Sequence, residues 1–259
     1  MCKNFLKTCI ILLVIAGTAV VGAKYIIDQP NINFLSLFSK NTASNPIVLS
    51  EERRKLHADG LFYSKSKKGY VFYKNGVISH GKVTNKKVTY WLDTTGKIYA
   101  VKINVPVISQ MPELPTGCEM TAVAMLLQYK DIKISKFQVA DQTPRSMNAD
   151  TGFIGNPYSP TGGWVFPKGI APVVDKYLGK SENMTGASMT TIYEKLLHGH
   201  PVVVWMANFN TFSNHAIILT GYDKKSIFYN NPWTGKKEKI SKSSFITHWN
   251  DNQRRALSY

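Results

Sequence analysis

The chain has 259 residues, 44% of them hydrophobic and 12% aromatic, which is enough to bury one full core and leave room for a smaller module. This composition excludes a chain that is disordered throughout. The formal charge of +16 favours anionic polymers or lipid head groups as partners, or is ordinary solubility charge, since no run of five basic residues occurs. No nucleic-acid-binding signature accompanies the charge, so nucleic acid is not an expected partner.

The first 23 residues read as a signal peptide or an N-terminal membrane anchor. Lys3 and Lys7 precede an uncharged segment, 8–23, that ends in small residues suited to signal peptidase. Cleavage after Ala23 is the first expectation. An uncleaved anchor is the alternative, because apolar residues 25–27 lengthen the stretch. Either way we expect an extracytoplasmic protein, secreted or anchored to the cell membrane.

The next two segments are predicted to be a linker, 24–50, and a small β-hairpin module, 51–101. The linker is rich in Asn, Ser and Pro. The module alternates aromatic and polar residues around two turns, Asn75-Gly76 and 93–96. It resembles a degenerate pair of the aromatic repeats of choline- or glucan-binding surface proteins. The other interpretation is a small β-meander packed onto the main domain.

Residues 102–259 are predicted to form an α+β domain that begins with helices and ends with strands. The apolar residues of the run 120–129 share one helical face, which predicts a helix. We expect this helix to start at or just before Cys118. Further helices are expected at about 168–178, 189–198 and 245–249. Strands are expected at 202–207, 216–222 and 226–230, the last two as a hairpin.

Cys118 is the candidate nucleophile. Cys2 and Cys9 fall in the targeting segment, so Cys118 has no partner for an internal disulfide, and such a lone thiol is either reactive or paired between molecules. The first turn of a helix stabilises a thiolate through unpaired N–H groups and the helix dipole. A small buried core residue is the equally weighted alternative.

Three further residues complete the predicted site. His215 is the only one of six histidines that opens an apolar strand, from which its ring can face a helix N-terminus. Asn231 ends the next strand and can hold the imidazole, although its surroundings also read as a turn. Gln110, eight residues before Cys118, can supply an oxyanion donor or is a surface glutamine.

Four segments in order resemble the C39-like peptidase family, bacterial relatives of the bacteriocin-leader peptidases. They are 106–119, 153–157, 199–205, and 215–223 followed by 231–233. The resemblance spans about 103–250 and implies a papain-like cysteine peptidase fold, in which a catalytic helix packs on an antiparallel sheet. It carries the nucleophile to Cys118, the base to His215 and the oxyanion amide to Gln110.

The chain also departs from the leader peptidases. Glu119 follows the cysteine where glycine is usual, and Gln110 lies farther from the nucleophile, so cleavage of double-glycine leaders is not implied. Asn231 stands where the family often has aspartate, and an asparagine cannot stabilise an imidazolium by charge. Glu119 suits a capping or electrostatic role in the first turn, and its charge opposes thiolate formation.

We therefore predict a cysteine-dependent hydrolase that acts on peptide or amide bonds at the bacterial cell envelope, with a Cys118-His215-Asn231 triad and no metal or organic cofactor. Its partners are a peptide or cell-wall peptide substrate and, on charge, an anionic envelope polymer. Acyl transfer and peptidoglycan amide hydrolysis are alternative reactions. A catalytically silent surface binding or adhesion module is the non-enzymatic alternative. Four aromatic residues are expected either to line the cleft or to pack in the core: Tyr158, Trp164, Trp205 and Trp233.

Overall fold

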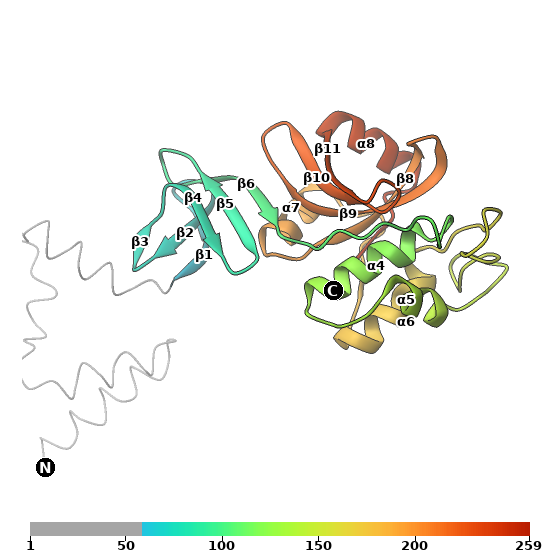
Figure 1. Cartoon of the computed structure of the whole chain (residues 1–259). Helices are drawn as coiled ribbons and strands as arrows, with labels where there is room; N and C mark the ends of the chain where they lie inside the picture. The colour runs from blue at the N-terminus through green and yellow to red at the C-terminus, as the bar shows by residue number, and fades with distance from the viewer. Residues whose placement is uncertain (1–58) are drawn as a thin grey trace, which may run out of the picture. The chain divides into compact units, whose positions relative to one another are not determined.

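The computed structural model describes residues 59–259 (Figure 1). The expected signal or anchor, the linker 24–50 and the start of the hairpin module lie outside the described residues. Across 59–259, no helix is both long enough and apolar enough to cross a membrane.

The strands form two antiparallel sheets. The smaller sheet contains β1 (Gly60–Ser64), β2 (Gly69–Lys74) and β3 (Val77–Ile78). The larger sheet has the order β4-β5-β6-β9-β8-β12-β7, and a β10–β11 hairpin also pairs with β9. Its strands are β4 (Gly81–Asn85), β5 (Val88–Leu92), β6 (Ile98–Ile103), β7 (Glu182–Asn183), β8 (Val202–Phe209), β9 (Phe212–Tyr222), β10 (Ser226–Asn231), β11 (Lys236–Ser241) and β12 (Ala256–Ser258).

Both predicted turns of the hairpin module are present. Asn75 and Gly76 join β2 to β3 with φ values of 52° and 69°, as a type I′ turn requires. The second turn joins β5 to β6, and the Asp93 carboxylate accepts the N–H groups of Thr95 and Lys97 there. β6 runs past residue 101 and pairs with β9, so the second hairpin continues the larger sheet.

The described residues form five helices: α4 (Cys118–Tyr129), α5 (Lys136–Gln142), α6 (Pro167–Leu178), α7 (Met189–Leu197) and α8 (Lys242–Asp251). The predicted helices are confirmed, and α4 begins at Cys118. The apolar face read from the sequence is buried, and the other residues of 118–127 are buried as well. The helix lies on β9 and β8 and is covered by α5 and α6 on its other sides.

The predicted strands are confirmed but too short. β8 and β9 extend to a two-residue turn at Asn210-Thr211, both with positive φ. His215 therefore does not open its strand. It lies inside β9, opposite Met206 of β8.

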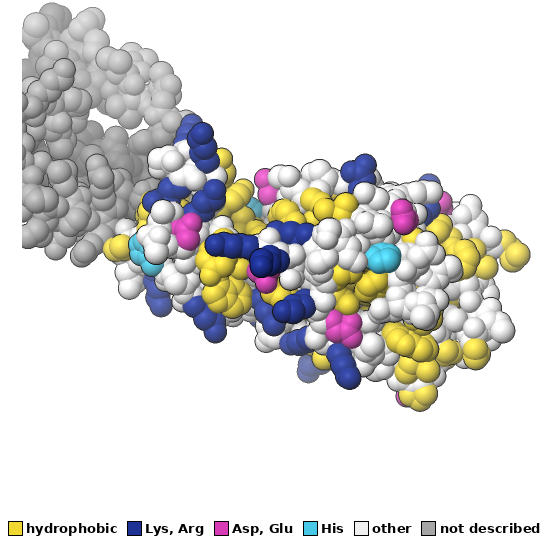
Figure 2. Space-filling model, turned by 90° about the horizontal axis from the view of Figure 1, so that it is seen from above, with side chains coloured by type: hydrophobic (Ala, Val, Ile, Leu, Met, Phe, Trp, Pro, Cys, Tyr) yellow, Lys and Arg dark blue, Asp and Glu magenta, His cyan; other side chains and the backbone are white. Residues whose placement is uncertain are grey.

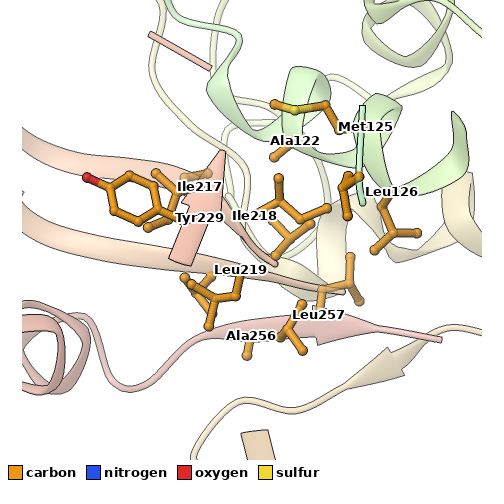
Figure 3. Close-up of a cluster of buried hydrophobic side chains, with 14 of the residues drawn as sticks. Ala122, Met125, Leu126, Ile217, Ile218, Leu219, Tyr229, Ala256 and Leu257 are labelled. Carbon is orange, nitrogen blue, oxygen red and sulfur yellow. The ribbon is translucent and has the colours of Figure 1, made fainter. Parts of the chain in front are cut away.

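The core is centred on α4, β9 and β12. Figure 3 shows side chains of α4 above those of β9, with β12 below them. The labelled residues that meet there include Ala122, Met125, Leu126, Ile217, Ile218, Leu219, Ala256 and Leu257, all fully buried. β9 has a continuous apolar run, 216–219, because both of its faces are covered. The predicted α+β architecture, a helix packed on an antiparallel sheet, is confirmed.

Candidate active site

A cleft of about 330 Å³ brings three of the four predicted site residues together. Cys118, His215 and Gln110 line it, and Asn231 lies behind His215. Its other walls are the segment from Pro160 to Trp164 and the aromatic rings of Phe212 and Trp233. The cleft lies where the first turn of α4 meets β9.

Cys118 is held at the start of α4 with its sulfur toward β9. The N-cap residue, Gly117, makes no side-chain cap, and a Cβ there would come within 2.7 Å of the Leu114 side chain. As the first helical residue, Cys118 has an N–H with no acceptor inside the helix. Its Sγ accepts the Ala216 N–H at 3.4 Å, and Ala216 follows His215 in β9.

The hydrogen bonds around Asn231 fix the tautomer of His215. Asn231 Oδ1 accepts the Trp233 N–H at 3.0 Å, and its Nδ2 donates to Glu238 Oε2 at 3.1 Å. The His215 Nε2, 2.9 Å from that Oδ1, must therefore carry the proton and donate. His215 Nδ1 then keeps its lone pair and can accept a proton, which is the property that a general base needs.

The thiol proton points to a carboxyl group. Cys118 Sγ donates to Glu119 Oε2 at 3.3 Å, and within residues 59–259 no hydrogen bond joins the thiol to His215. The Glu119 side chain is fully buried, and its Oε1 accepts the Val165 N–H at 3.3 Å and Asn214 Nδ2 at 3.5 Å. Glu119 therefore ties the helix start to the loop before α6 and to β9.

Burial keeps Cys118 and His215 neutral in the resting site. It raises the pKa of the Cys118 thiol well above its ordinary value, and the Glu119 charge raises it further. Burial also lowers the pKa of His215 to about 4, although the hydrogen bond to Asn231 and the charge of Glu238 oppose that shift. The expected thiolate at the helix terminus is thus replaced by a thiol beside a neutral imidazole, because burial and Glu119 outweigh the helix terminus.

Burial acts on Glu119 as well. It raises the pKa of this carboxyl from 4.5 to about 7, and the hydrogen bonds from Val165 and Asn214 only partly offset that rise. Glu119 therefore changes its charge near neutral pH, beside the nucleophile. Sequence reasoning placed Glu119 in the first turn but had no signal for its burial.

Glu238 is a site residue that the sequence analysis missed. It lies on β11 opposite Tyr229 of β10, and its carboxylate accepts Asn231 Nδ2 and, at 2.6 Å, the Thr234 hydroxyl. Its negative charge raises the pKa of His215. Glu238 thus supplies a negative charge that Asn231 lacks, and Asn231 lies between Glu238 and His215. The sequence analysis predicted no strand over the lysine-rich segment 236–241, so it had no reason to place Glu238 beside β10.

Gln110 lies at the cleft with its amide hydrogens already engaged. Nε2 donates to Leu114 O at 3.1 Å and to Pro115 O at 2.9 Å, while Oε1 is buried without a hydrogen-bond partner. Its backbone N–H donates to Pro232 O at 2.8 Å, which ties this loop to the segment after Asn231. The expected surface alternative is excluded, since Gln110 is 2% exposed.

The four aromatic residues expected in the cleft or in the core fall into three groups, because Tyr158 lies in neither. Trp164 and Trp233 line the cleft. Trp205 is a core residue whose Nε1 donates to Val165 O at 2.8 Å. Tyr158 stacks on Phe137 and donates its hydroxyl to Asp141, away from the cleft lining. Phe212, which the sequence analysis did not single out, covers one face of the His215 ring with centroids 5.1 Å apart.

The described part of the chain contains one cysteine, Cys118, and its thiol is free. No group of three or more His, Cys, Asp and Glu side chains within 59–259 is arranged to hold a metal ion.

Comparisons with known proteins relate most of the described chain to a peptidase family. A model of the peptidase C39 like family matches residues 102–257. The uncharacterized protein YvpB of Bacillus subtilis (strain 168) is 30% identical over 180 residues, which cover 58% of this chain and 72% of YvpB. A crystal structure of a candidate C39-like peptidase from Bacillus anthracis has a TM-score of 0.57 and 29% identity, and covers 60% of this chain and 94% of that chain. The papain-like fold predicted from the sequence is consistent with this likeness.

Proposed function

The chain belongs to the peptidase C39 like family, and on that premise we propose that it is a cysteine-dependent hydrolase of peptide or amide bonds. One observation carries the proposal. Cys118 at a helix start shares a cleft with His215, whose Nε2 is held by Asn231 and whose Nδ1 is left basic. This is the arrangement that nucleophilic catalysis by a thiol requires.

In the proposed reaction, the thiol proton leaves its hydrogen bond with Glu119 Oε2. It passes from Sγ to His215 Nδ1 as Sγ attacks the substrate carbonyl carbon. The imidazolium then gives this proton to the leaving amine, and a thioester remains on Cys118. A water molecule, deprotonated by His215, attacks the thioester, releases the acid product and restores the thiol. Glu238 supports the imidazolium by charge, because Asn231 connects the two groups.

The oxyanion of the tetrahedral intermediate has two donors in this proposal. The first is the Cys118 N–H, which has no acceptor within α4. The second is Gln110, whose Nε2 must exchange Pro115 O or Leu114 O for the oxyanion when substrate binds. Gln110→Ala is expected to lower kcat by roughly 100- to 1000-fold, the usual effect of removing one such donor.

We also propose that the reaction takes place outside the cytoplasm, on peptides or cell-wall peptides. The support is the basic and then uncharged character of residues 1–23, typical of a signal peptide or membrane anchor. A fusion of residues 1–50 to alkaline phosphatase tests this placement. Phosphatase activity in intact cells supports export, and an inactive cytoplasmic fusion contradicts it.

Activity is tested by incubating the purified protein with casein, a peptide library and isolated cell wall, and by analysing the products by mass spectrometry. The matched variant is Cys118→Ser, which keeps the size of the side chain but removes the sulfur. New amine termini in the wild type that are absent in Cys118→Ser support hydrolysis. Equal product formation by a folded Cys118→Ser protein contradicts it.

A catalytically silent binding module is the second candidate function. The observation that favours it is the hydrogen bond that Cys118 Sγ donates to Glu119 instead of to His215. Burial also raises the pKa of the thiol. A peptidyl chloromethyl ketone separates the two candidates, because it alkylates a thiol quickly only when a base and a substrate cleft assist. Labelling of Cys118 only after denaturation supports the silent module.

A further inference from the structure

The outer face of the larger sheet carries a row of residues in register across five strands. Pairing aligns Thr84 of β4, Thr89 of β5, Lys102 of β6, Gly221 of β9 and Phe228 of β10. Along β5 the alternate residues Val88, Tyr90 and Leu92 are buried, so the row lies on the opposite, accessible face.

Gly221 keeps this row open in the middle. It has no side chain, and a Cβ at its position would lie 2.1 Å from Val101 O. Lys102 therefore reaches across it, with Nζ 5.4 Å from the centre of the Phe228 ring. Beside this contact is a depression of about 310 Å³, lined by Trp91, Tyr99, Lys102, Asp223 and Phe228.

Each of the three aromatic rings has a lysine above it. Lys82 Nζ lies 6.0 Å from the Trp91 ring, and Lys224 Nζ lies 4.8 Å from the Tyr99 ring. The third pair is Lys102 and Phe228. In the view of Figure 2, Lys and Arg side chains border a hydrophobic patch over the part of the molecule where β5 and β6 lie in Figure 1.

A second depression, of about 360 Å³, shares the lining residue Lys102 with the first. Lys86, Lys87 and Lys237 also line it, together with Thr84 and Thr89 of the row. Lys87 is paired with Asp131, and Lys237 donates to Asn104. Asp223 is the one acidic side chain that lines either depression in the described structure.

We propose that this lysine–aromatic face, defined by Lys82, Trp91, Tyr99, Lys102, Lys237 and Phe228, binds a linear anionic glycan. Flat aromatic rings at a surface offer stacking area to sugar rings, and the interleaved ammonium groups match carboxylate or other anionic substituents along the chain. The two depressions lie on either side of Lys102, which both share, and this suits an extended polymer. The proposal does not depend on Cys118 chemistry, since it concerns another surface and a binding equilibrium.

Asp223 favours a glycan over a nucleic acid. Its Oδ1 accepts the N–H groups of Lys225 and Ser226, which fixes the carboxylate beside the aromatic depression. A fixed carboxylate there accepts hydrogen bonds from the free hydroxyl groups of sugar rings, which the internal nucleotides of single-stranded DNA lack. Aromatic stacking alone would suit both polymers, so single-stranded DNA is an arm of the test.

The test measures binding of the full chain to polygalacturonate by isothermal titration at two salt concentrations. Lys102→Ala/Lys237→Ala is expected to raise Kd at least tenfold, and Tyr99→Ala is expected to do the same. The matched controls are Lys168→Ala/Lys180→Ala, exposed lysines elsewhere that remove the same charge, and Tyr63→Ala, an exposed tyrosine of β1. Both controls are expected to stay within twofold of the wild type.

Polyphosphate separates charge from stacking. Its binding is expected to weaken in the Lys102→Ala/Lys237→Ala protein and to be unchanged in Tyr99→Ala. Three results overturn the proposal: equal loss of polygalacturonate binding in the control lysine pair, no effect of Tyr99→Ala on polygalacturonate binding, or tighter binding of single-stranded DNA with the same dependence on Tyr99 and Lys102.

Discussion

The proton on Cys118 lies between two possible acceptors, Glu119 and His215, and the two acceptors have opposite effects on the sulfur. A charged Glu119 raises the pKa of the thiol, whereas a neutral His215 can remove the proton as the sulfur attacks. Glu119→Gln keeps an oxygen for the Val165 N–H and removes the charge. It is therefore a clean probe of this balance.

We expect Glu119→Gln to increase the rate of Cys118 alkylation by iodoacetamide at pH 8, because the thiolate forms more readily without the neighbouring charge. Peptide mapping assigns the adduct, since Cys2 and Cys9 also carry thiols. Glu194→Gln, an exposed carboxylate on α7, is the control and should leave the rate unchanged. A slower reaction in Glu119→Gln would contradict this role of the charge.

The second residue-scale prediction concerns Glu238. Its charge raises the pKa of His215 through the Asn231 contact, so Glu238→Gln is expected to lower the pKa of His215 and to reduce kcat. Titration of the His215 ring by NMR in a Cys118→Ser background checks the pKa without relying on turnover. An unchanged His215 pKa in Glu238→Gln would contradict the role of the Glu238 charge.

The third prediction is a pair of opposed pH effects on stability. The pKa of Glu119 rises from 4.5 to about 7 on folding, so the folded state binds more protons and stability falls as pH rises between these values. The pKa of His215 falls from 6.5 to about 4, so the unfolded state binds more protons and stability rises over that window. The two effects nearly cancel, because each is worth roughly 3 kcal/mol.

Variants that remove one of the two groups should reveal the pH dependence of stability that the other group causes. Relative to the wild type, urea unfolding of Glu119→Gln is expected to show stability that increases from pH 4.5 to 6.5, and His215→Gln is expected to show stability that decreases over the same range. Parallel curves for the wild type and both variants would contradict the opposed shifts.

At the scale of elements, hydrophobic periodicity and turn chemistry predicted most of what forms. Asn75-Gly76, the apolar run of α4 and the β9–β10 hairpin were readable because each is a local pattern. Four elements within 102–259 were missed: α5, β7, β11 and β12. α5 begins with a capping box at Ser135 and Gln138 that was available in the sequence. β11, which pairs with β10, is polar and lysine-rich, and its sequence lacks the alternation of apolar and polar residues that predicts a strand.

The same distinction explains the site. The helix start at Cys118 and the hairpin that carries His215 and Asn231 are local features that the residues predict, whereas the expectation that they meet came from the resemblance to the C39-like family. Burial is a property of the whole fold, so the protonation of Glu119, the contact of Glu238 and the engaged amide of Gln110 could not be read from the sequence.

Gly221 supports an element-scale prediction, because it lies where β6, β9 and β10 meet. A Cβ there would contact Val101 O at 2.1 Å, and its φ of +155° strains any other residue. We expect Gly221→Ala to destabilise the protein by about 3 kcal/mol or more. Gly179→Ala is the comparison: Gly179 has φ +79° but open space, so it should cost only about 1 kcal/mol. Equal losses in urea unfolding would contradict the clash.

At the scale of the whole molecule, β6 makes the second hairpin part of the larger sheet. The Tyr90 hydroxyl of β5 donates to Leu197 O of α7 at 3.1 Å in a buried contact, and Lys87 donates to Tyr129 O of α4. Residues 59–259 should therefore unfold together. The family match begins at residue 102, so a boundary placed there divides a continuous sheet.

Tyr90→Phe tests this coupling. Loss of the hydroxyl leaves Leu197 O buried and unpaired, so we expect a loss of about 1 to 3 kcal/mol within a single cooperative transition. Tyr99→Phe, at an exposed position of β6, should change stability by less than about 0.5 kcal/mol. A separate early transition for the hairpins, seen by calorimetry, would contradict joint unfolding.

The central claim, that Cys118 and His215 act together as nucleophile and base, is tested most directly by the rate at which a peptidyl chloromethyl ketone alkylates Cys118 in the native protein. We expect a single adduct at Cys118 in the wild type, formed much more slowly in His215→Ala, with both proteins labelled equally once denatured. Equal native rates in the wild type and His215→Ala, or an adduct at Cys118 only after denaturation, would contradict it.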